Sequence, residues 1–213
     1  MKAVAASLAV GLAVMEACAP PSAGGVTPPV PVVEDTTSRA NVPAGFGSLR
    51  QDDIAIRLEP QGLIVRAIPL DESVIRLLTP DSYRALRDLE ESNHRTIESI
   101  TRRSGGRPPD LWYVSFYGLE ENARFSPMEL VITSGGQDFR PLDVIPLSTG
   151  FGEQRLRQRE TQSAVYVYPG EIDVDHPLTV TFQGQQSVIW EQLLQRIERE
   201  RALVRARASR TGS

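Results

Sequence analysis

Three arginines at alternate positions form the first group of residues whose type and spacing could bind a ligand. Arg155, Arg157 and Arg159 lie in one short run, and an extended backbone would point all three guanidinium groups to the same face. Guanidinium groups bind phosphate and carboxylate through paired hydrogen bonds, so this face would suit lipid headgroups, lipopolysaccharide phosphates or an acidic protein. Because charged runs usually serve only to contact solvent, the sequence favours a solvated loop over a binding site.

A second group consists of three carboxylates in a short acidic segment. Glu171, Asp173 and Asp175 could supply oxygen ligands to a hard cation such as calcium, which takes about six to eight of them. The segment lacks the glycine and the spacing of an EF-hand loop. The three acids alternate with Ile172 and Val174, so the favoured interpretation is the solvent-facing side of a strand edge. We therefore expect neither a metal nor another cofactor.

The sequence contains few of the parts that catalysis requires. Its two histidines are His94, in a charged helical segment, and His176, which precedes a proline in an expected turn. A nucleophile elbow, a phosphate-binding loop and a dinucleotide-binding fingerprint are missing from the sequence. No complete set of catalytic partners can be named for either histidine. A non-catalytic protein is therefore favoured over an enzyme.

Tyrosines form the remaining candidate surface. Tyr113 and Tyr117 alternate with the apolar residues of one expected strand, and Tyr166 and Tyr168 do so in another. All four side chains are expected on the faces opposite the core, where neighbouring strands would join them into an aromatic patch of the kind enriched at binding interfaces. The favoured alternative is that an amphipathic helix covers them. Tyr113 and Tyr117 join the three arginines as the candidate ligand or partner surface.

The overall charge and the cysteine content restrict the class of protein further. The 213 residues carry a formal net charge of −4, which gives no general attraction to nucleic acid, so we expect no nucleic-acid partner. Cys18 is the only cysteine, which excludes an intramolecular disulfide and a multi-cysteine metal site. The length suits one domain with appendages.

The N-terminal residues have the pattern of a bacterial export signal. Lys2 is followed by an uninterrupted run of small and apolar residues from Ala3 to Met15, shorter than the roughly 20 residues that span a bilayer. The junction Met15-Glu16-Ala17-Cys18 resembles the lipobox of bacterial lipoproteins. This resemblance implies cleavage before Cys18 and attachment of lipid to its sulfur, so that the mature chain contacts a membrane through its N-terminus.

The same resemblance implies a location in the cell envelope. Ala19 follows Cys18 in place of the aspartate that retains lipoproteins in the inner membrane, so the outer membrane or the periplasmic face is favoured. Secretion of a soluble product is the alternative, because Ala17-Cys18-Ala19 also fits the small-residue rule for signal cleavage. Pro20 would then follow the cut directly, which disfavours that cleavage.

The sequence predicts, in order, a signal peptide, a disordered tether, a β-domain with a helical insertion, an amphipathic helix and a disordered tail. The tether is expected because prolines and small residues dominate it and large apolar side chains are scarce. The insertion and the final helix are expected from apolar residues at helical spacing, after Thr79-Pro80 and after Ser187. The predicted segments are 1–17, 18–50, 51–187 with the insertion at about 71–104, 188–208 and 209–213.

Short runs of period two predict an antiparallel sheet fold that is mainly β with helices, in the α+β class. The segment from Phe125 to Pro141 resembles the hairpin of immunoglobulin-like domains on bacterial surface proteins, which implies an immunoglobulin-like β-sandwich with an inserted helix and a C-terminal helix. The expected strands are Ile54–Leu58, Leu63–Ala67, Leu111–Gly118, Met128–Thr133, Leu142–Leu147, Ala164–Tyr168 and Leu178–Phe182.

Two classes of function are compatible with these features. The favoured hypothesis is a non-catalytic envelope module that binds or assembles with another envelope protein. The alternative is an envelope enzyme or small-ligand-binding protein, in which Asp173, Asp175, Arg155 and Arg157 converge in one concave pocket.

Overall fold

The computed structural model describes residues 42–43 and 45–211 and shows an α+β fold built mostly from antiparallel sheets. The predicted signal peptide, Cys18 and most of the predicted tether lie outside the described residues. Among the described helices, none combines the length and the apolar character needed to cross a bilayer.

The larger sheet contains five strands, and each neighbouring pair is antiparallel. Their spatial order is β1 (Ile56–Leu58), β2 (Leu63–Pro69), β3 (Asp110–Gly118), β9 (Thr161–Tyr168) and β7 (Asp143–Pro146). The hairpin of β1 and β2 is confirmed, with Ile56 paired to Ala67 across a turn that contains Gly62. The apolar alternation therefore predicts this part of the sheet correctly.

A smaller sheet contains four antiparallel strands in the order β11 (Gln185–Ser187), β10 (Leu178–Phe182), β5 (Val131–Ser134) and β6 (Gln137–Phe139). The Gly135-Gly136 turn joins β5 to β6 and confirms the glycine-rich hairpin. The predicted strand over Met128–Thr133 is only half present, because Pro127 starts a short 3-10 turn, η1 (Pro127–Glu129), before β5. A two-stranded pair, β4 (Ala123–Arg124) and β8 (Arg155–Leu156), completes the sheets.

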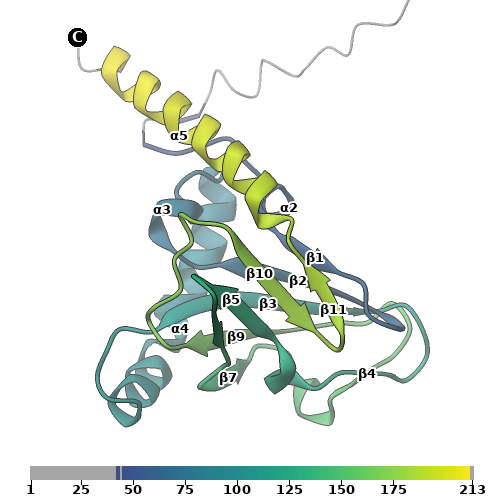
Figure 1. Cartoon of the computed structure of the whole chain (residues 1–213). Coiled ribbons are helices and arrows are strands. Elements are labelled where there is room, and N and C mark those ends of the chain that lie inside the picture. Colours follow the sequence, from purple (N-terminus) through teal and green to yellow (C-terminus); the bar gives the residue numbers. More distant parts are fainter. Residues whose placement is uncertain (1–41, 44, 212–213) are drawn as a thin grey trace, which may run out of the picture. The chain divides into compact units, whose positions relative to one another are not determined.

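The two main sheets, whose strands are labelled in Figure 1, are joined by aromatic side chains. Trp112, Val114 and Phe116 of β3 are buried on the face directed toward the smaller sheet. The ring of Phe116 lies 5.6 Å from that of Phe182 in β10 and packs against rings from three other segments as well. Aromatic pairs at these separations add about 0.5–1.5 kcal/mol each beyond the burial of their area. The core therefore lies between the sheets.

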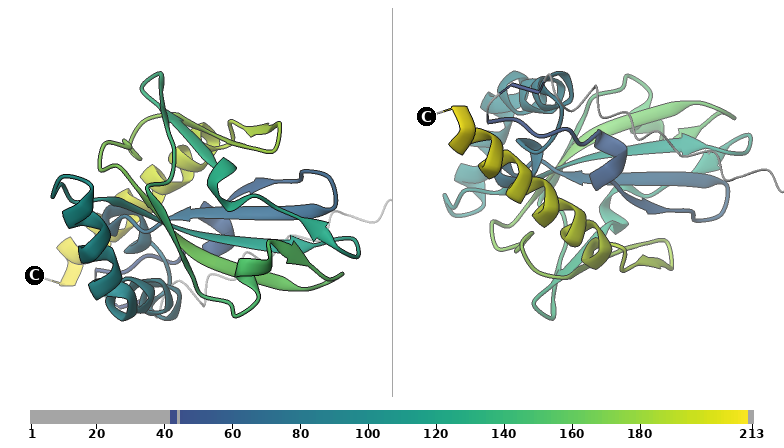
Figure 2. Two further views of the ribbon diagram at one scale, coloured as in Figure 1. Left: turned by 90° about the horizontal axis from the view of Figure 1, so that it is seen from below. Right: turned by 90° about the horizontal axis from the view of Figure 1, so that it is seen from above.

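The long helix α4 (Pro80–Arg103) connects the end of β2 to the start of β3. Pro80 lies in its first turn, where a missing amide hydrogen is tolerated, and two arginines end it where the helix dipole favours cations. Its buried residues are Leu86, Ile97 and Ile100, whereas the His94 side chain is 66% exposed and lies off this apolar face. Both views in Figure 2 place α4 at one end of the strands. The short helix α3 (Glu72–Ile75) precedes it, with Asp71 as its N-cap.

The C-terminal helix α5 (Trp190–Thr211) packs with its first half and extends past the strands with its second (Figure 1). Trp190, Leu193 and Ile197 are buried, and the Trp190 indole N–H donates to the carbonyl of Val174 at 3.1 Å. Residues between 201 and 209 are half-buried or exposed. A one-turn helix, α2 (Gln51–Ile54), contacts α5.

The prediction that Tyr166 and Tyr168 lie on the face opposite the core is wrong. Both are fully buried on the core face, because the register of β9 pairs Tyr166 with Trp112. Val165 and Val167, on the opposite side of β9, are buried too, so alternation of side-chain types does not identify the core face of this part of the strand. The Tyr168 hydroxyl donates to the Leu130 carbonyl at 3.0 Å, whereas the Tyr166 hydroxyl has no partner among the described residues. Burial raises the pKa of both hydroxyls, so both stay protonated.

Residues 46–49, which the sequence assigns to the tether, are held against the segment that precedes α4. The amide of Gly47 donates to the Arg76 carbonyl at 2.9 Å, and that of Leu49 donates to the Leu77 carbonyl at 3.1 Å. A Cβ atom on Gly47 would lie 1.8 Å from the Leu77 oxygen, so only glycine permits this approach.

The same segment is fixed to α5 by a buried carboxylate. Glu200 is 3% exposed and accepts hydrogen bonds from the amide of Ser48 at 2.8 Å, from the Ser48 hydroxyl at 3.1 Å and from Arg207 at 2.9 Å. Arg207 also donates to the carbonyl of Phe46 at 3.2 Å. We call Glu200, Ser48 and Arg207 the Glu200 clasp. Breaking a buried, hydrogen-bonded charge pair by removing one partner costs about 3–5 kcal/mol, so the clasp secures the start of the folded unit.

Tyr166→Phe and Tyr168→Phe are expected to change the free energy of unfolding in opposite directions. Removing the hydroxyl of Tyr166, which has no partner among the described residues, should raise stability by up to about 1 kcal/mol, because the cost of burying an unpaired polar group is removed. Tyr168→Phe takes the donor away from the Leu130 carbonyl and should lower stability by about 1–3 kcal/mol. Urea unfolding at neutral pH measures both variants. Equal losses in the two would contradict this hydrogen-bond assignment.

Candidate functional site

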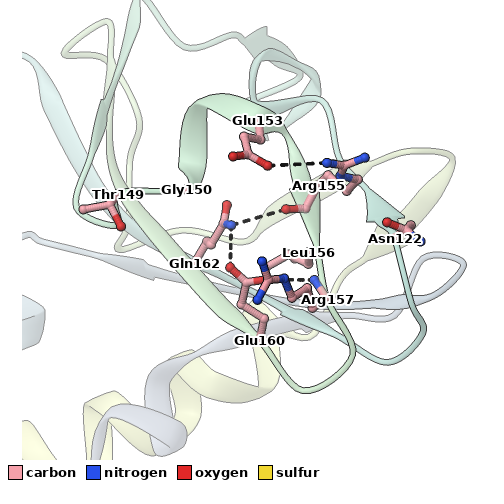
Figure 3. A pocket seen from close by; sticks show the side chains of 9 residues that line it. All are labelled: Asn122, Thr149, Gly150, Glu153, Arg155, Leu156, Arg157, Glu160 and Gln162. Carbon is pink, nitrogen blue, oxygen red and sulfur yellow. Dashed lines mark hydrogen bonds and ion pairs between the residues drawn. The ribbon is translucent and has the colours of Figure 1, made fainter.

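The structure places Arg155 and Arg157 in the lining of one polar pocket (Figure 3). The pocket is bounded by the turn before β4, the 3-10 turn η2 (Phe151–Glu153), β8 and the first residues of β9. Its volume is about 270 Å³. We call it the Gln162 pocket, and its lining residues are Asn122, Thr149, Gly150, Glu153, Arg155, Leu156, Arg157, Glu160 and Gln162.

The backbone on one side of the pocket is fixed to the end of β3. The amide of Gly118 donates to the Glu160 carbonyl at 2.9 Å, and the carbonyl of Gly118 accepts from the Arg159 amide at 2.7 Å. A Cβ atom on Gly118 would lie 2.3 Å from the Arg157 carbonyl oxygen, so this close approach requires glycine. Leu156, between the two lining arginines, is fully buried. The arginine segment is therefore part of the rigid framework.

Left-handed backbone conformations border the same pocket. Three of the four non-glycine residues with positive φ in the described part of the chain are Asn122, Gln154 and Arg159. Asn122 precedes β4, Gln154 precedes β8, and Arg159 lies in the turn before β9. Such conformations cost about 1–3 kcal/mol each, persist only where the surrounding structure enforces them, and cluster at functional sites.

One aromatic residue anchors the η2 turn in the core. Phe151 is buried, and its ring packs edge-on against Phe125 at 5.2 Å and against Phe116 at 6.0 Å. Gly150 and Glu153, on either side of this anchor, both line the pocket. The interior packing of Phe151 therefore sets the position of the η2 turn over the pocket.

Gln162 provides a hydrogen-bond acceptor that the protein does not use. The residue is 3% exposed, and its Nε2 donates to the Glu160 carboxylate at 2.8 Å and to the Arg155 carbonyl at 3.3 Å. Both partners only accept hydrogen bonds, which fixes the orientation of the amide, and Oε1 points away from them (Figure 3). Oε1 has no partner among the described residues. A buried acceptor without a donor costs about 1–3 kcal/mol, which a suitable ligand group would recover.

Glu160 organises the pocket. One of its carboxylate oxygens accepts from Gln162, and the other accepts from the backbone amide of Arg157 at 2.8 Å. The hydrogen bond from the Arg157 amide, followed by that from Gln162, lowers the pKa of the Glu160 carboxyl group. The side chain therefore stays ionised at neutral pH and holds Gln162 in place.

The two lining arginines keep donors available for a ligand. Arg155 lies 3.6 Å from the Glu153 carboxylate, beyond normal hydrogen-bond length, and these side chains are 51% and 69% exposed. Exposed pairs of this kind contribute only about 0–1 kcal/mol and rearrange easily. The Arg157 guanidinium makes no hydrogen bond or ion pair with the other described residues. Arg157 and Gln162, whose Oε1 is also unused, both belong to the lining of the pocket.

The other members of the predicted surface lie outside the pocket. The three arginines do not share the single face that an extended backbone would give them, because β8 ends at Leu156 and the chain turns, leaving Arg159 exposed with a φ of 65°. Tyr113 and Tyr117 are half-buried on the sheet face opposite to Gln162. Tyr113 packs against the core.

The acidic residues form separate ion pairs. Each carboxylate of the predicted cation loop has its own partner on a different segment or turn. Among the described residues, no group of three or more histidine, cysteine or acidic side chains is placed to hold a metal ion. The pairs are Glu171 with Arg107 at 2.6 Å, Asp173 with His176 at 2.6 Å and Asp175 with Arg201 at 2.7 Å.

The structure contradicts the convergence of Asp173 and Asp175 with Arg155 and Arg157 that the alternative hypothesis requires. Asp173 lines a different, shallow pocket together with His176. The reason is the length of β9, whose eight residues, at about 3.3 Å each, separate the Gln162 pocket from the acidic loop that follows the strand.

Sequence reasoning missed Gln162, Glu153 and Glu160. The signal for Gln162 was its position in the alternation of β9, where it shares the inward phase of Ala164 and Tyr166. A polar residue at a position with the core phase breaks the expected pattern, and such breaks concentrate at functional or strained sites. The two glutamates lie in turns and had no such signal.

Comparisons of the chain with protein-family models, with curated protein sequences and with solved structures found no match. The chemistry of the Gln162 pocket is therefore the basis on which its function is inferred.

Gly150→Ala is expected to lower the free energy of unfolding by about 1–2 kcal/mol, and Gly152→Ala to leave it within about 0.5 kcal/mol. A Cβ atom on Gly150 would lie 2.7 Å from Nε2 of Gln162, which is buried and held by two hydrogen bonds. A Cβ atom on Gly152, in the same turn, would meet nothing within 4 Å. Urea unfolding compares the two variants. A neutral Gly150→Ala variant would show that Gln162 moves freely.

Proposed function

We propose that the chain is an exported protein, anchored in the cell envelope through lipid on Cys18, whose folded part is a non-catalytic module that binds a small polar ligand in the Gln162 pocket. The apolar run after Lys2 and the lipobox resemblance support the export and the anchor. The proline-rich segment that follows supports a tether. The outer membrane or the periplasmic face is the proposed location.

For the fold, we propose that the two main sheets form an immunoglobulin-like β-sandwich. Two observations support this arrangement: the contact between Phe116 and Phe182 from opposite sheets, and the glycine-rich hairpin of β5 and β6. In this arrangement α4 is an insertion between β2 and β3, and α5 is a C-terminal addition.

The binding function rests on one observation, which is that a buried acceptor without a partner and an exposed, unpaired guanidinium belong to the lining of the same pocket. Among the described residues, Oε1 of Gln162 has no donor, and the guanidinium of Arg157 has no acceptor and is open to solvent. Folded chains rarely leave a buried side-chain oxygen unpaired, and such exceptions call for an explanation. A ligand that satisfies both groups at once provides that explanation.

The chemistry of the lining favours binding over catalysis. The lining residues include no histidine, cysteine or lysine, and the hydroxyl of Thr149 makes no hydrogen bond to a base among the described residues that could activate it as a nucleophile. Glu160, whose pKa is lowered, has both carboxylate oxygens engaged in hydrogen bonds, so it does not serve as a proton donor. The fixed groups of the pocket therefore orient a ligand and leave its covalent bonds unchanged.

The size of the pocket restricts the ligand. Sites for drug-sized molecules occupy about 300–1,000 Å³ and are lined mostly by apolar groups. The Gln162 pocket measures about 270 Å³, and Leu156 is the one aliphatic side chain in its lining. It therefore suits a small polar molecule or the polar end of a larger one.

Cys18→Ser is expected to abolish incorporation of labelled palmitate and to move the protein from the membrane fraction to the soluble fraction. The reason is that the thiol is the acceptor of the lipid in the proposed pathway. Metabolic labelling followed by fractionation measures both effects. Palmitate that fails to enter the unaltered chain, with the product found in the medium, would contradict the anchor.

Arg157→Gln is expected to remove ligand binding while leaving the fold intact, because its guanidinium makes no bond to the other described residues. The measurement is the thermal stabilisation of the full chain by a panel of small polar compounds. Arg159→Gln is the matched control, since it removes the same charge two positions away and outside the pocket. A panel that stabilises both variants equally, or a stoichiometric protein partner recovered with no compound bound, would contradict the proposal.

A further inference from the structure

Resting on the proposed binding function, we infer that the ligand of the Gln162 pocket is an α-amino carboxylate, meaning a carboxylate with an N–H donor on the adjacent carbon. Free amino acids and the C-terminal residue of a peptide share this chemistry. The inference follows from the types of group that the lining leaves unsatisfied and from those that it already contains.

The guanidinium of Arg157 selects the carboxylate. A guanidinium presents paired donors in a plane and binds a carboxylate through two parallel hydrogen bonds. Arg157 has these donors free of the other described residues, while its backbone amide is held by Glu160 and its carbonyl is packed against Gly118. The position of the residue is therefore fixed at the backbone while its head group remains available.

The glutamates of the lining select against more highly charged anions. Glu153 and Glu160 contribute two negative charges beside the two positive charges of Arg155 and Arg157, so the four side chains sum to no net charge. A dianion such as phosphate would meet repulsion from both carboxylates. A monoanion that brings a hydrogen-bond donor or a positive charge of its own avoids this repulsion.

Oε1 of Gln162 selects the donor. This oxygen is buried behind the lining and its orientation is fixed, so only a slender group such as an N–H reaches it. The Arg155 and Glu153 side chains, which are exposed and 3.6 Å apart, are the part of the lining free to separate and admit that group. An N–H group on the carbon next to a carboxylate places a donor and an anionic acceptor close together in one small molecule.

Glu153 distinguishes the two possible sources of the ligand. A free amino acid carries an ammonium group, which has three N–H donors and can bind Gln162 and a carboxylate together. The last residue of a peptide carries an amide with one N–H, which Gln162 alone would satisfy. Glu153→Gln is therefore expected to weaken the binding of a free amino acid and to leave the binding of a peptide terminus unchanged.

The test is a titration of the full mature chain in detergent micelles, followed by NMR signals of the side-chain amide of Gln162. Glycine represents the free amino acid, N-acetylglycine represents the peptide terminus, and acetate is the matched carboxylate without the donor. We expect at least one of the first two to bind at least tenfold more tightly than acetate, which corresponds to about 1.4 kcal/mol. Inorganic phosphate is expected to bind more weakly than either.

Arg157→Gln should lower the affinity for the ligand that binds by at least tenfold, and Arg159→Gln should leave this affinity unchanged. The comparison with acetate alters the ligand and not the protein, so its result does not depend on whether a variant folds. Acetate or phosphate binding as tightly as glycine and N-acetylglycine would overturn the inference. A different polar compound that binds in an Arg157-dependent manner, with neither test compound bound, would overturn the ligand class and leave the binding function standing.

Discussion

The side chain of Phe116 is the constraint on which the two sheets and the pocket jointly depend. Its ring stacks on Phe125 at 4.4 Å and contacts Phe182 of the smaller sheet and Phe151 of the η2 turn. A single position in the central strand therefore sets the distance between the sheets and the position of the turn that closes over Gln162. Burial of aromatic area supplies most of the energy of such a cluster, and the preferred ring geometry adds specificity. The polar pocket therefore depends on the packing of these buried aromatic rings.

Within the pocket, the charged groups divide into those that hold the structure and those that remain available. The two carboxylate oxygens of Glu160 accept hydrogen bonds from Gln162 and from the Arg157 amide, so the negative charge of this side chain is fixed in place. The arginine head groups are less restrained. That of Arg157 makes no bond to the other described residues, and that of Arg155 is only loosely paired, so a rigid frame carries adaptable donors. A binding site needs this combination, because a preorganised frame reduces the entropy lost when a ligand is immobilised.

The sequence predicts the strands better than it predicts the site, for reasons that particular residues make clear. In the hairpin of β1 and β2 and in β3, buried apolar residues recur at every second position, so period two identifies these strands. From Ala164 to Tyr168, β9 is buried on both faces, which is why alternation misplaces Tyr166 and Tyr168. The site depends on contacts distant in sequence, such as that between Gly118 and Arg157, and on the turn after Leu156. No local pattern of residue types encodes such contacts, and the arginines alone point to the right segment without revealing its partners.

The Glu200 clasp determines how the start of the folded unit responds to mechanical force. Tension applied along the chain toward residue 46 would load the hydrogen bonds to Glu200, Arg76 and Leu77 together, so that several bonds resist in parallel instead of opening one at a time. Figure 1 shows the C-terminal end of α5 far from β4, so this path of force bypasses the strand ends around Gln162. A pull on the chain ahead of residue 46 would therefore be met at the α5 end of the fold, and the shape of the Gln162 pocket would be preserved under load.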